Sequence, residues 1–258
     1  MNKYLENIST HANTIGMGDP QPPTNNSVGT EPLPIKTAKA KRMKRLKDHI
    51  KESILGNWED IDIEKDIKSE IKQFLKDNYR GRFSITLDGD NYVVNSRTSV
   101  IVMNKNISSL TNKMFRFGDV KDFDCSYCES LTSLEGAPEK VRDFDCRFCD
   151  FLTSLEGAPK VVSGDFKCRY CNSLKTLKGA PEKVGGNFEC GHCDALINLE
   201  GAPKKVSRVF NCYGCNSLIN LEGAPKEVGK DFQCCDCKRQ FTEKDVTDVC
   251  NVKGSIKI

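Results

Sequence analysis

Pairs of cysteines are the residues of this chain best suited to chemistry. Fourteen of its 258 residues are cysteines, and twelve of them form six Cys-x-x-Cys pairs. Eighteen residues separate neighbouring pairs at Cys149 and Cys168, which is within the spacing of four-cysteine zinc sites. The twelve paired cysteines are Cys125, Cys128, Cys146, Cys149, Cys168, Cys171, Cys190, Cys193, Cys212, Cys215, Cys234 and Cys237.

Three interpretations of these pairs remain open: zinc sites, buried free thiols and disulfides. Neighbouring pairs would form zinc sites, beginning with Cys125 and Cys128 together with Cys146 and Cys149, and zinc would then stabilise the fold. Alternatively, the thiols are buried as small apolar side chains, because free cysteine is among the most buried residue types. Equivalent sulfurs on stacked strands would lie about 4.8 Å apart, wider than a tetrahedral zinc with bonds of about 2.3 Å allows. We therefore expect a ladder of buried thiols and no cofactor, with zinc as the alternative.

The remaining candidates for catalysis do not form a site. The three histidines are His11, His49 and His192. His192 lies between two cysteines, but no residue that would orient it as a base is indicated. The chain has no Walker phosphate-binding loop and no Gly-x-Ser-x-Gly motif. We therefore expect a protein without enzymatic activity, in which His192 is a variable surface residue.

The cysteine pairs belong to an internal repeat in the second half of the chain. Five copies of F-x-C-x-x-C-x-x-L-x-x-L-x-G-A-P-x-x-V begin at Phe123, Phe144, Phe166, Phe188 and Phe210. These starts are 21 or 22 residues apart, and a sixth start at Phe232 breaks off. The Phe and the first Cys share one side of a strand, and Gly-Ala-Pro turns the chain. A unit this short cannot bury its own apolar side, so the stacked copies are predicted to form a solenoid with one continuous core.

The repeat resembles the leucine-rich repeat, whose pattern is L-x-x-L-x-L-x-x-N/C-x-L over 20–29 residues. In this resemblance the Phe and the first Cys take strand positions, and the second Cys takes the Asn/Cys ladder position. The wording L-T-S-L-E-G-A-P and D-F-D-C is similar to that of repeat proteins common in tailed bacteriophages and related mobile elements. The resemblance covers residues 92–250 and implies a leucine-rich-repeat-like β-solenoid encoded by a phage. It implies no activity.

The part of the chain before the repeats is predicted to contain a tail and two helices. Residues 1–35 are polar and rich in proline, and we expect them to be disordered. Residues 36–80 contain two amphipathic helices, one over 38–55 and one over 62–78, because their apolar residues recur every three or four positions.

Both ends of the repeat region, residues 121–232, are predicted to carry caps. Residues 81–120 contain a hairpin that turns at Asp88-Gly89-Asp90, a strand that starts at Ser99 and a degenerate first coil. Residues 233–258 cap the other end, because a solenoid needs atypical terminal units over its open edges. The predicted fold class is therefore α+β.

Charge and hydropathy limit the partners. The chain has 39 Lys and Arg against 36 Asp and Glu, a net charge of +3, which argues against a strongly basic nucleic-acid-binding protein. The basic stretch 36–51 would suit contact with nucleic acid or anionic lipid, but a solvated helix face is favoured because aromatic stacking residues are missing. The chain has no apolar run long enough for a membrane span and no secretory signal. We expect it in the host cytoplasm or the virion, with reduced thiols.

A comparison of the copies within the chain indicates a candidate binding surface. Core positions barely change between copies, whereas outward strand positions vary. The candidate binding residues are Asp124, Asp145, Lys167 and Glu189, together with Tyr127, Phe148 and Tyr170 at equivalent places along one rim. A constant scaffold with a varied face is typical of solenoids that bind proteins. Simple drift at exposed positions explains the same variation. We expect a protein partner.

Overall fold

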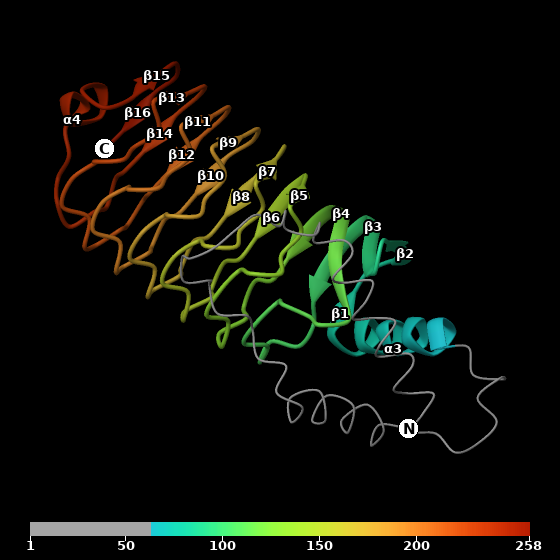
Figure 1. Cartoon of the computed structure of the whole chain (residues 1–258). Helices are drawn as coiled ribbons and strands as arrows, with labels where there is room; N and C mark the ends of the chain where they lie inside the picture. The colour runs from blue at the N-terminus through green and yellow to red at the C-terminus, as the bar shows by residue number, and fades with distance from the viewer. Residues whose placement is uncertain (1–62) are drawn as a thin grey trace, which may run out of the picture. The chain divides into compact units, whose positions relative to one another are not determined.

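The computed structural model describes residues 63–258, which all lie in one compact unit, Ile50–Ile258 (Figure 1). This part of the chain is a β-solenoid preceded by a helix, which confirms the α+β fold class and the C-terminal solenoid. The predicted tail over 1–35 and the predicted helix over 38–55 lie outside the described residues. In residues 63–258, neither helix has the length and apolar character that a membrane crossing requires.

The helix α3, Ile63–Asn78, confirms the helix predicted over 62–78. Its apolar face packs into the core through Ile71 and Leu75, which are 0% and 1% exposed. Acidic residues lie in its first turn and Lys76 in its last, an arrangement that favours the helix dipole.

A hairpin follows α3 at the N-terminal end of the solenoid. Strand β2, Ser84–Asp88, pairs antiparallel with β3, Asn91–Val102, around Gly89 at φ +59°. Strand β1, Tyr79–Arg80, pairs with the end of β3. This confirms the predicted hairpin.

The prediction of a separate strand from Ser99 is wrong, because β3 continues through this residue. Its parallel pairing with β4, Phe115–Asp124, shifts register between Val94 and Ser96 and again between Ser96 and Ser99. Such bulges let one strand bend and continue where a regular ladder would end.

The solenoid contains two sheets, so most coils contribute two short strands, and the pairing in both sheets is parallel from β3 onward. The first sheet has the order β1-β3-β4-β6-β8-β10-β12-β14-β16 and pairs the Phe positions of neighbouring coils, such as Phe166 and Phe188. Its short strands are β6 (Asp143–Asp145), β8 (Phe166–Lys167), β10 (Phe188–Glu189), β12 (Phe210–Asn211), β14 (Phe232–Gln233) and β16 (Ile256–Lys257).

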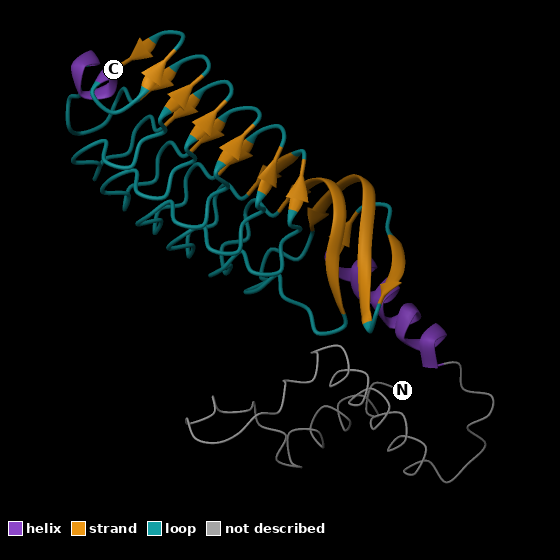
Figure 2. Ribbon diagram, turned by 45° about the horizontal axis from the view of Figure 1, so that its top comes forward, coloured by secondary structure: helices purple, strands orange, loops and turns teal. Residues whose placement is uncertain are grey.

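The second sheet has six strands, at the Val position before each Phe. They are β5 (Lys140–Val141), β7 (Val161–Val162), β9 (Lys183–Val184), β11 (Lys205–Val206), β13 (Glu227–Val228) and β15 (Asn251–Val252). The leucine positions form strand-free arcs. Figure 2 shows the short strands stacked in a row and the arcs on the opposite side of the coils.

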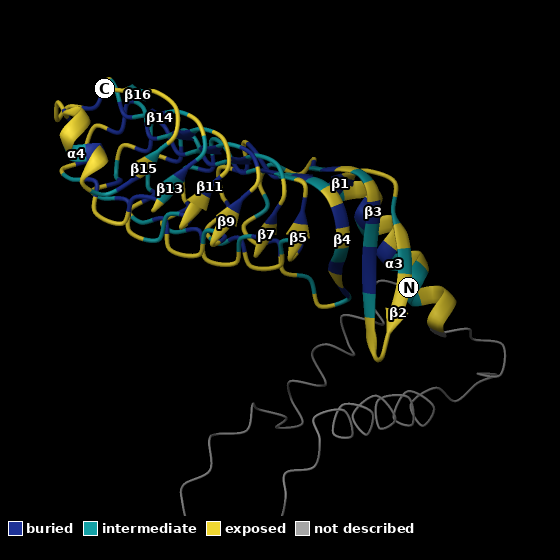
Figure 3. Cartoon of the chain, turned by 90° about the horizontal axis from the view of Figure 1, so that it is seen from above, coloured by how far each residue is buried: buried dark blue, intermediate teal, exposed yellow. Residues whose placement is uncertain are grey.

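The core runs the length of the solenoid as columns of identical side chains. The repeat Phe residues are at most 1% exposed. Phe166 lies between Phe144 and Phe188, with ring centroids 5.2 Å away on both sides. The repeat leucines and valines are buried beside this column, and the exposed segments lie on the outside (Figure 3).

The turn residues of the repeat have specific structural tasks. The glycine of Gly-Ala-Pro has a positive φ in every full repeat, and a Cβ on Gly157 would collide with the backbone of Glu135 in the preceding coil. The residue before this glycine is Glu or Lys, and its backbone N–H donates to a side-chain oxygen two residues earlier. Glu135 donates in this way to Ser133 at 3.1 Å, and Glu222 donates to Asn220 at 3.1 Å. This explains why Ser, Thr or Asn occupies this position.

The C-terminal segment contains a short helix that the sequence did not predict. Helix α4, Glu243–Thr247, begins at a capping box formed by Thr242 and Asp245. Val246 and Phe241 of this segment are buried.

Candidate interaction surface

The paired cysteines lie in the core as two columns. All twelve are buried, and all fourteen cysteines of the chain are free thiols. The second thiol of a pair donates to the carbonyl oxygen of the first cysteine in the preceding coil. This bond is 3.2 Å from Cys149 to Cys125, 3.2 Å from Cys171 to Cys146, 3.1 Å from Cys193 to Cys168, 3.2 Å from Cys215 to Cys190 and 3.5 Å from Cys237 to Cys212.

The hydrogen bonds and the protonation of these thiols oppose zinc binding. Burial raises the pKa of Cys128, Cys215 and Cys234 to about 12, so these thiols hold their protons at neutral pH. Zinc binds thiolates, and coordination would therefore require the thiols to lose both protons and hydrogen bonds. Residues 63–258 contain no group of three or more His, Cys, Asp or Glu residues that could hold a metal ion.

Four rings form a continuous stack that runs across the strands of the first sheet, three residues beyond the C-terminal end of each strand. Ring centroids are 4.5 Å apart between Tyr127 and Phe148, 4.6 Å between Phe148 and Tyr170, and 4.6 Å between Tyr170 and His192. Their planes are within 9° of parallel. We call these four residues the aromatic ladder. The structure thus brings together the three aromatic residues that the sequence placed along one rim.

The backbone explains why these rings point outward. Each ladder residue lies between the two cysteines of a pair and has a positive φ, from 56° to 60°. This left-handed conformation costs a non-glycine residue about 1–3 kcal/mol. A stacked aromatic pair contributes about 0.5–1.5 kcal/mol, which offsets part of that cost. The ladder therefore couples an unfavourable turn in each coil to its neighbours.

His192 is a ladder residue that sequence reasoning missed. It was predicted to be a variable surface residue, although it occupies the same repeat position as Tyr127 and carries a planar ring. The ladder ends beyond it at Gly214, where a Cβ would lie 2.6 Å from the His192 ring. Tyr213 packs against His192 edge-on instead, with centroids 4.9 Å apart and planes at 74°.

Asp124, Asp145, Lys167 and Glu189 form a row of candidate binding residues beside the ladder. Asp124 and Asp145 are held in place by hydrogen bonds at the start of the turns that contain the cysteine pairs. Asp145 accepts from the Arg147 guanidinium at 2.9 Å and 2.7 Å and from the Arg147 backbone N–H at 3.0 Å. Asp124 accepts from the backbone N–H of Ser126 at 2.9 Å. The two side chains therefore brace the turns that carry the ladder.

The other two members of the row form looser ion pairs. The ammonium of Lys167 lies 3.7 Å from Asp165, and the carboxylate of Glu189 lies 3.8 Å from Arg169. Arg169 also lies over the ring of Tyr170, 5.4 Å from its centroid, which connects the row to the ladder. We call the ladder together with Asp124, Asp145, Lys167 and Glu189 the rim surface.

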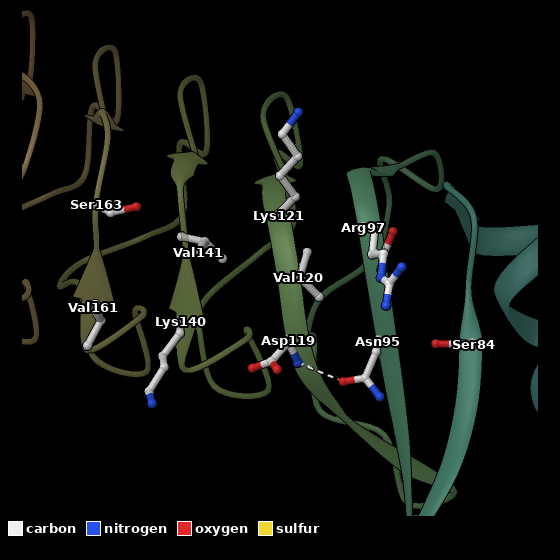
Figure 4. A pocket seen from close by; sticks show the side chains of 11 residues that line it. Ser84, Asn95, Arg97, Asp119, Val120, Lys121, Lys140, Val141, Val161 and Ser163 are labelled. Carbon is white, nitrogen blue, oxygen red and sulfur yellow. Dashed lines mark hydrogen bonds between the residues drawn. The ribbon is translucent and has the colours of Figure 1, made fainter.

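A separate hollow of about 700 Å³ lies beside β3, β4, β5 and β7 (Figure 4). Asn95 accepts there from the backbone N–H of Asp119 at 2.8 Å. Its cations do not meet at one point, because Lys121 and Lys140 extend toward opposite ends of the hollow and Arg97 extends from the neighbouring strand β3. The cations of the hollow therefore do not form a compact anion site.

No family model, curated protein or solved structure matches the chain.

Proposed function

We propose that this chain is a non-catalytic repeat protein, encoded by a phage or prophage, that binds another protein through the rim surface. The partner is a host factor or another component of the virion. The phage origin is supported by the amino-acid sequence of the repeats, and the binding role is supported by the rim surface.

The observation that carries the proposal is an ordered, partly exposed surface on a scaffold of near-identical coils. The ladder rings are held by stacking and by a fixed backbone, and the neighbouring Asp145 and Arg147 hold each other. Side chains that are already ordered lose little conformational entropy on binding. Tyr and Arg are also the residue types enriched among the residues that dominate binding energy. Tyr127 and Tyr170 belong to the rim surface, and Arg147 and Arg169 lie directly beside it.

Photo-crosslinking tests this assignment with two matched positions. Tyr127 and Phe151 are both exposed aromatic residues, 52% and 62% accessible, but only Tyr127 belongs to the rim surface. Each would be replaced separately by p-benzoyl-phenylalanine in the full chain, and crosslinked proteins from infected cells would be identified by mass spectrometry. We expect one protein to crosslink at position 127 and not at 151. Crosslinking at 151 alone would place binding on another face.

A zinc-stabilised structural protein is the second candidate. The observation that favours it is the stacking of Cys-x-x-Cys pairs, in which the thiol of Cys149 lies 3.2 Å from the carbonyl oxygen of Cys125 in the preceding coil. Metal analysis, described below, tests this candidate independently of partner binding.

A further inference from the structure

We propose that the open face of Tyr127 is a stacking site for one aromatic side chain of the partner protein. This inference rests on the proposed function and specifies the chemistry of the group that anchors the partner. The site would extend the aromatic ladder by one ring beyond its N-terminal end.

Tyr127 differs from the inner members of the ladder in having a ring stacked on one side only. Phe148 and Tyr170 each have a stacked ring on both sides. Within residues 63–258, Tyr127 has one ring partner, Phe148. Tyr127 is 52% exposed, whereas the other three ladder residues are half-buried.

The register of the strands shows why no ring of this chain continues the ladder. In the pairing of β3 with β4, Ile101 lies opposite Asp124. The chain leaves this register beyond β3, because the backbone N–H groups of Met103 and Asn104 donate to the carbonyl oxygen of Asn78 at 2.7 Å and 3.4 Å. The Asn104 amide donates to the Asn78 side chain at 3.1 Å, so it is held at the end of α3. The next position of the ladder therefore has no ring.

The charge beside the open face selects among planar groups. The Lys105 ammonium donates to the carbonyl oxygen of Ser126 at 2.7 Å, one residue before Tyr127. A guanidinium stacked on Tyr127 would experience repulsion from this ammonium, whereas a neutral aromatic ring would not. Parallel stacking on Tyr127 would also repeat the geometry already present between Tyr127 and Phe148. The occupant is therefore an aromatic side chain rather than an arginine.

A titration of the full chain followed by NMR tests the site with small probes. We expect N-acetyl-tryptophanamide to cause saturable ring-current shifts at Tyr127, Ser126 and Lys105. N-acetyl-leucinamide should cause none, and N-acetyl-argininamide much smaller ones. The shifts should disappear in Tyr127→Leu. They should persist in the matched control Tyr213→Leu, which changes a tyrosine at the far end of the ladder.

Several outcomes would overturn the inference. Shifts that persist in Tyr127→Leu, or that are as large with the arginine probe, would show that Tyr127 does not select an aromatic ring. No shift at Tyr127 at the solubility limit of the tryptophan probe would also contradict it. In that case, crosslinking of one partner at position 127 would leave the proposed function standing, so the two failures are distinguishable.

Discussion

Replacing Phe166 by Ala tests the stacked core most directly. Phe166 lies in the central coil, is 0% exposed and packs between the rings of Phe144 and Phe188, with centroids 5.2 Å away on each side. Deleting a buried phenylalanine costs about 3–5 kcal/mol, because transfer free energy is lost and a cavity remains. We expect the upper half of that range, since loss of the two ring contacts contributes roughly 0.5–1.5 kcal/mol each.

Phe151→Ala is the matched control for this experiment. It makes the same chemical change one coil earlier, at a side chain that is 62% exposed, and we expect a change within about 0.5 kcal/mol. Urea unfolding followed by far-ultraviolet circular dichroism would measure both variants against the parent. Because coils contact only their neighbours, unfolding midpoints and slopes should both be compared. A loss below about 1 kcal/mol for Phe166→Ala, or an equal loss for Phe151→Ala, would refute the buried column.

Three further predictions concern the thiols and the turns. Protein purified under reducing conditions should contain well under one zinc per chain and keep its melting temperature in chelator, whereas about three zincs and unfolding by chelator would support the zinc candidate. Because folding raises the pKa of Cys215 and Cys234 from 9.0 to about 12, their contribution to stability should be complete below pH 9 and be lost as the pH rises toward 12; a melting temperature that stays constant over this range would contradict their burial. Gly157→Ala should cost more than Gly89→Ala, because a Cβ at Gly157 collides with Glu135 backbone whereas that at Gly89 meets open space, and left-handed strain alone costs about 1–2 kcal/mol; equal losses in denaturant would argue against the tight turn.

The sequence predicted the solenoid because every repeat has the same apolar residues at the same positions. Phe, Cys, Leu and Val recur at fixed intervals, and their burial in columns follows from stacking. The hairpin at Gly89 and the helix before it were also predictable, since each is specified by local turn chemistry or by helical periodicity. The outward direction of Tyr127, Phe148 and Tyr170 followed from their common repeat position.

The remaining features depend on contacts between segments that no local pattern reveals. The second sheet is built from two-residue strands around each repeat valine, too short to show an alternating pattern. The continuation of β3 past Ser99 depends on bulges against β4. His192 joins the ladder because Tyr170 lies one coil away. Its type alone suggested a variable residue, whereas its repeat position was the signal that identified it.

Binding through the rim surface is tested most directly with a variant in which Tyr127, Phe148 and Tyr170 are changed to Ser. The quantity to measure is the affinity of this variant for the partner identified by crosslinking. The variant loses three stacked contacts, roughly 1.5–4.5 kcal/mol in total, so binding should be measured well below its melting temperature. Val206→Ala, which truncates a buried side chain in the second sheet, controls for destabilisation alone. We predict that the triple variant binds at least about tenfold more weakly, equivalent to 1.4 kcal/mol, while Val206→Ala binds like the parent. A folded triple variant with parental affinity would contradict binding through the rim surface.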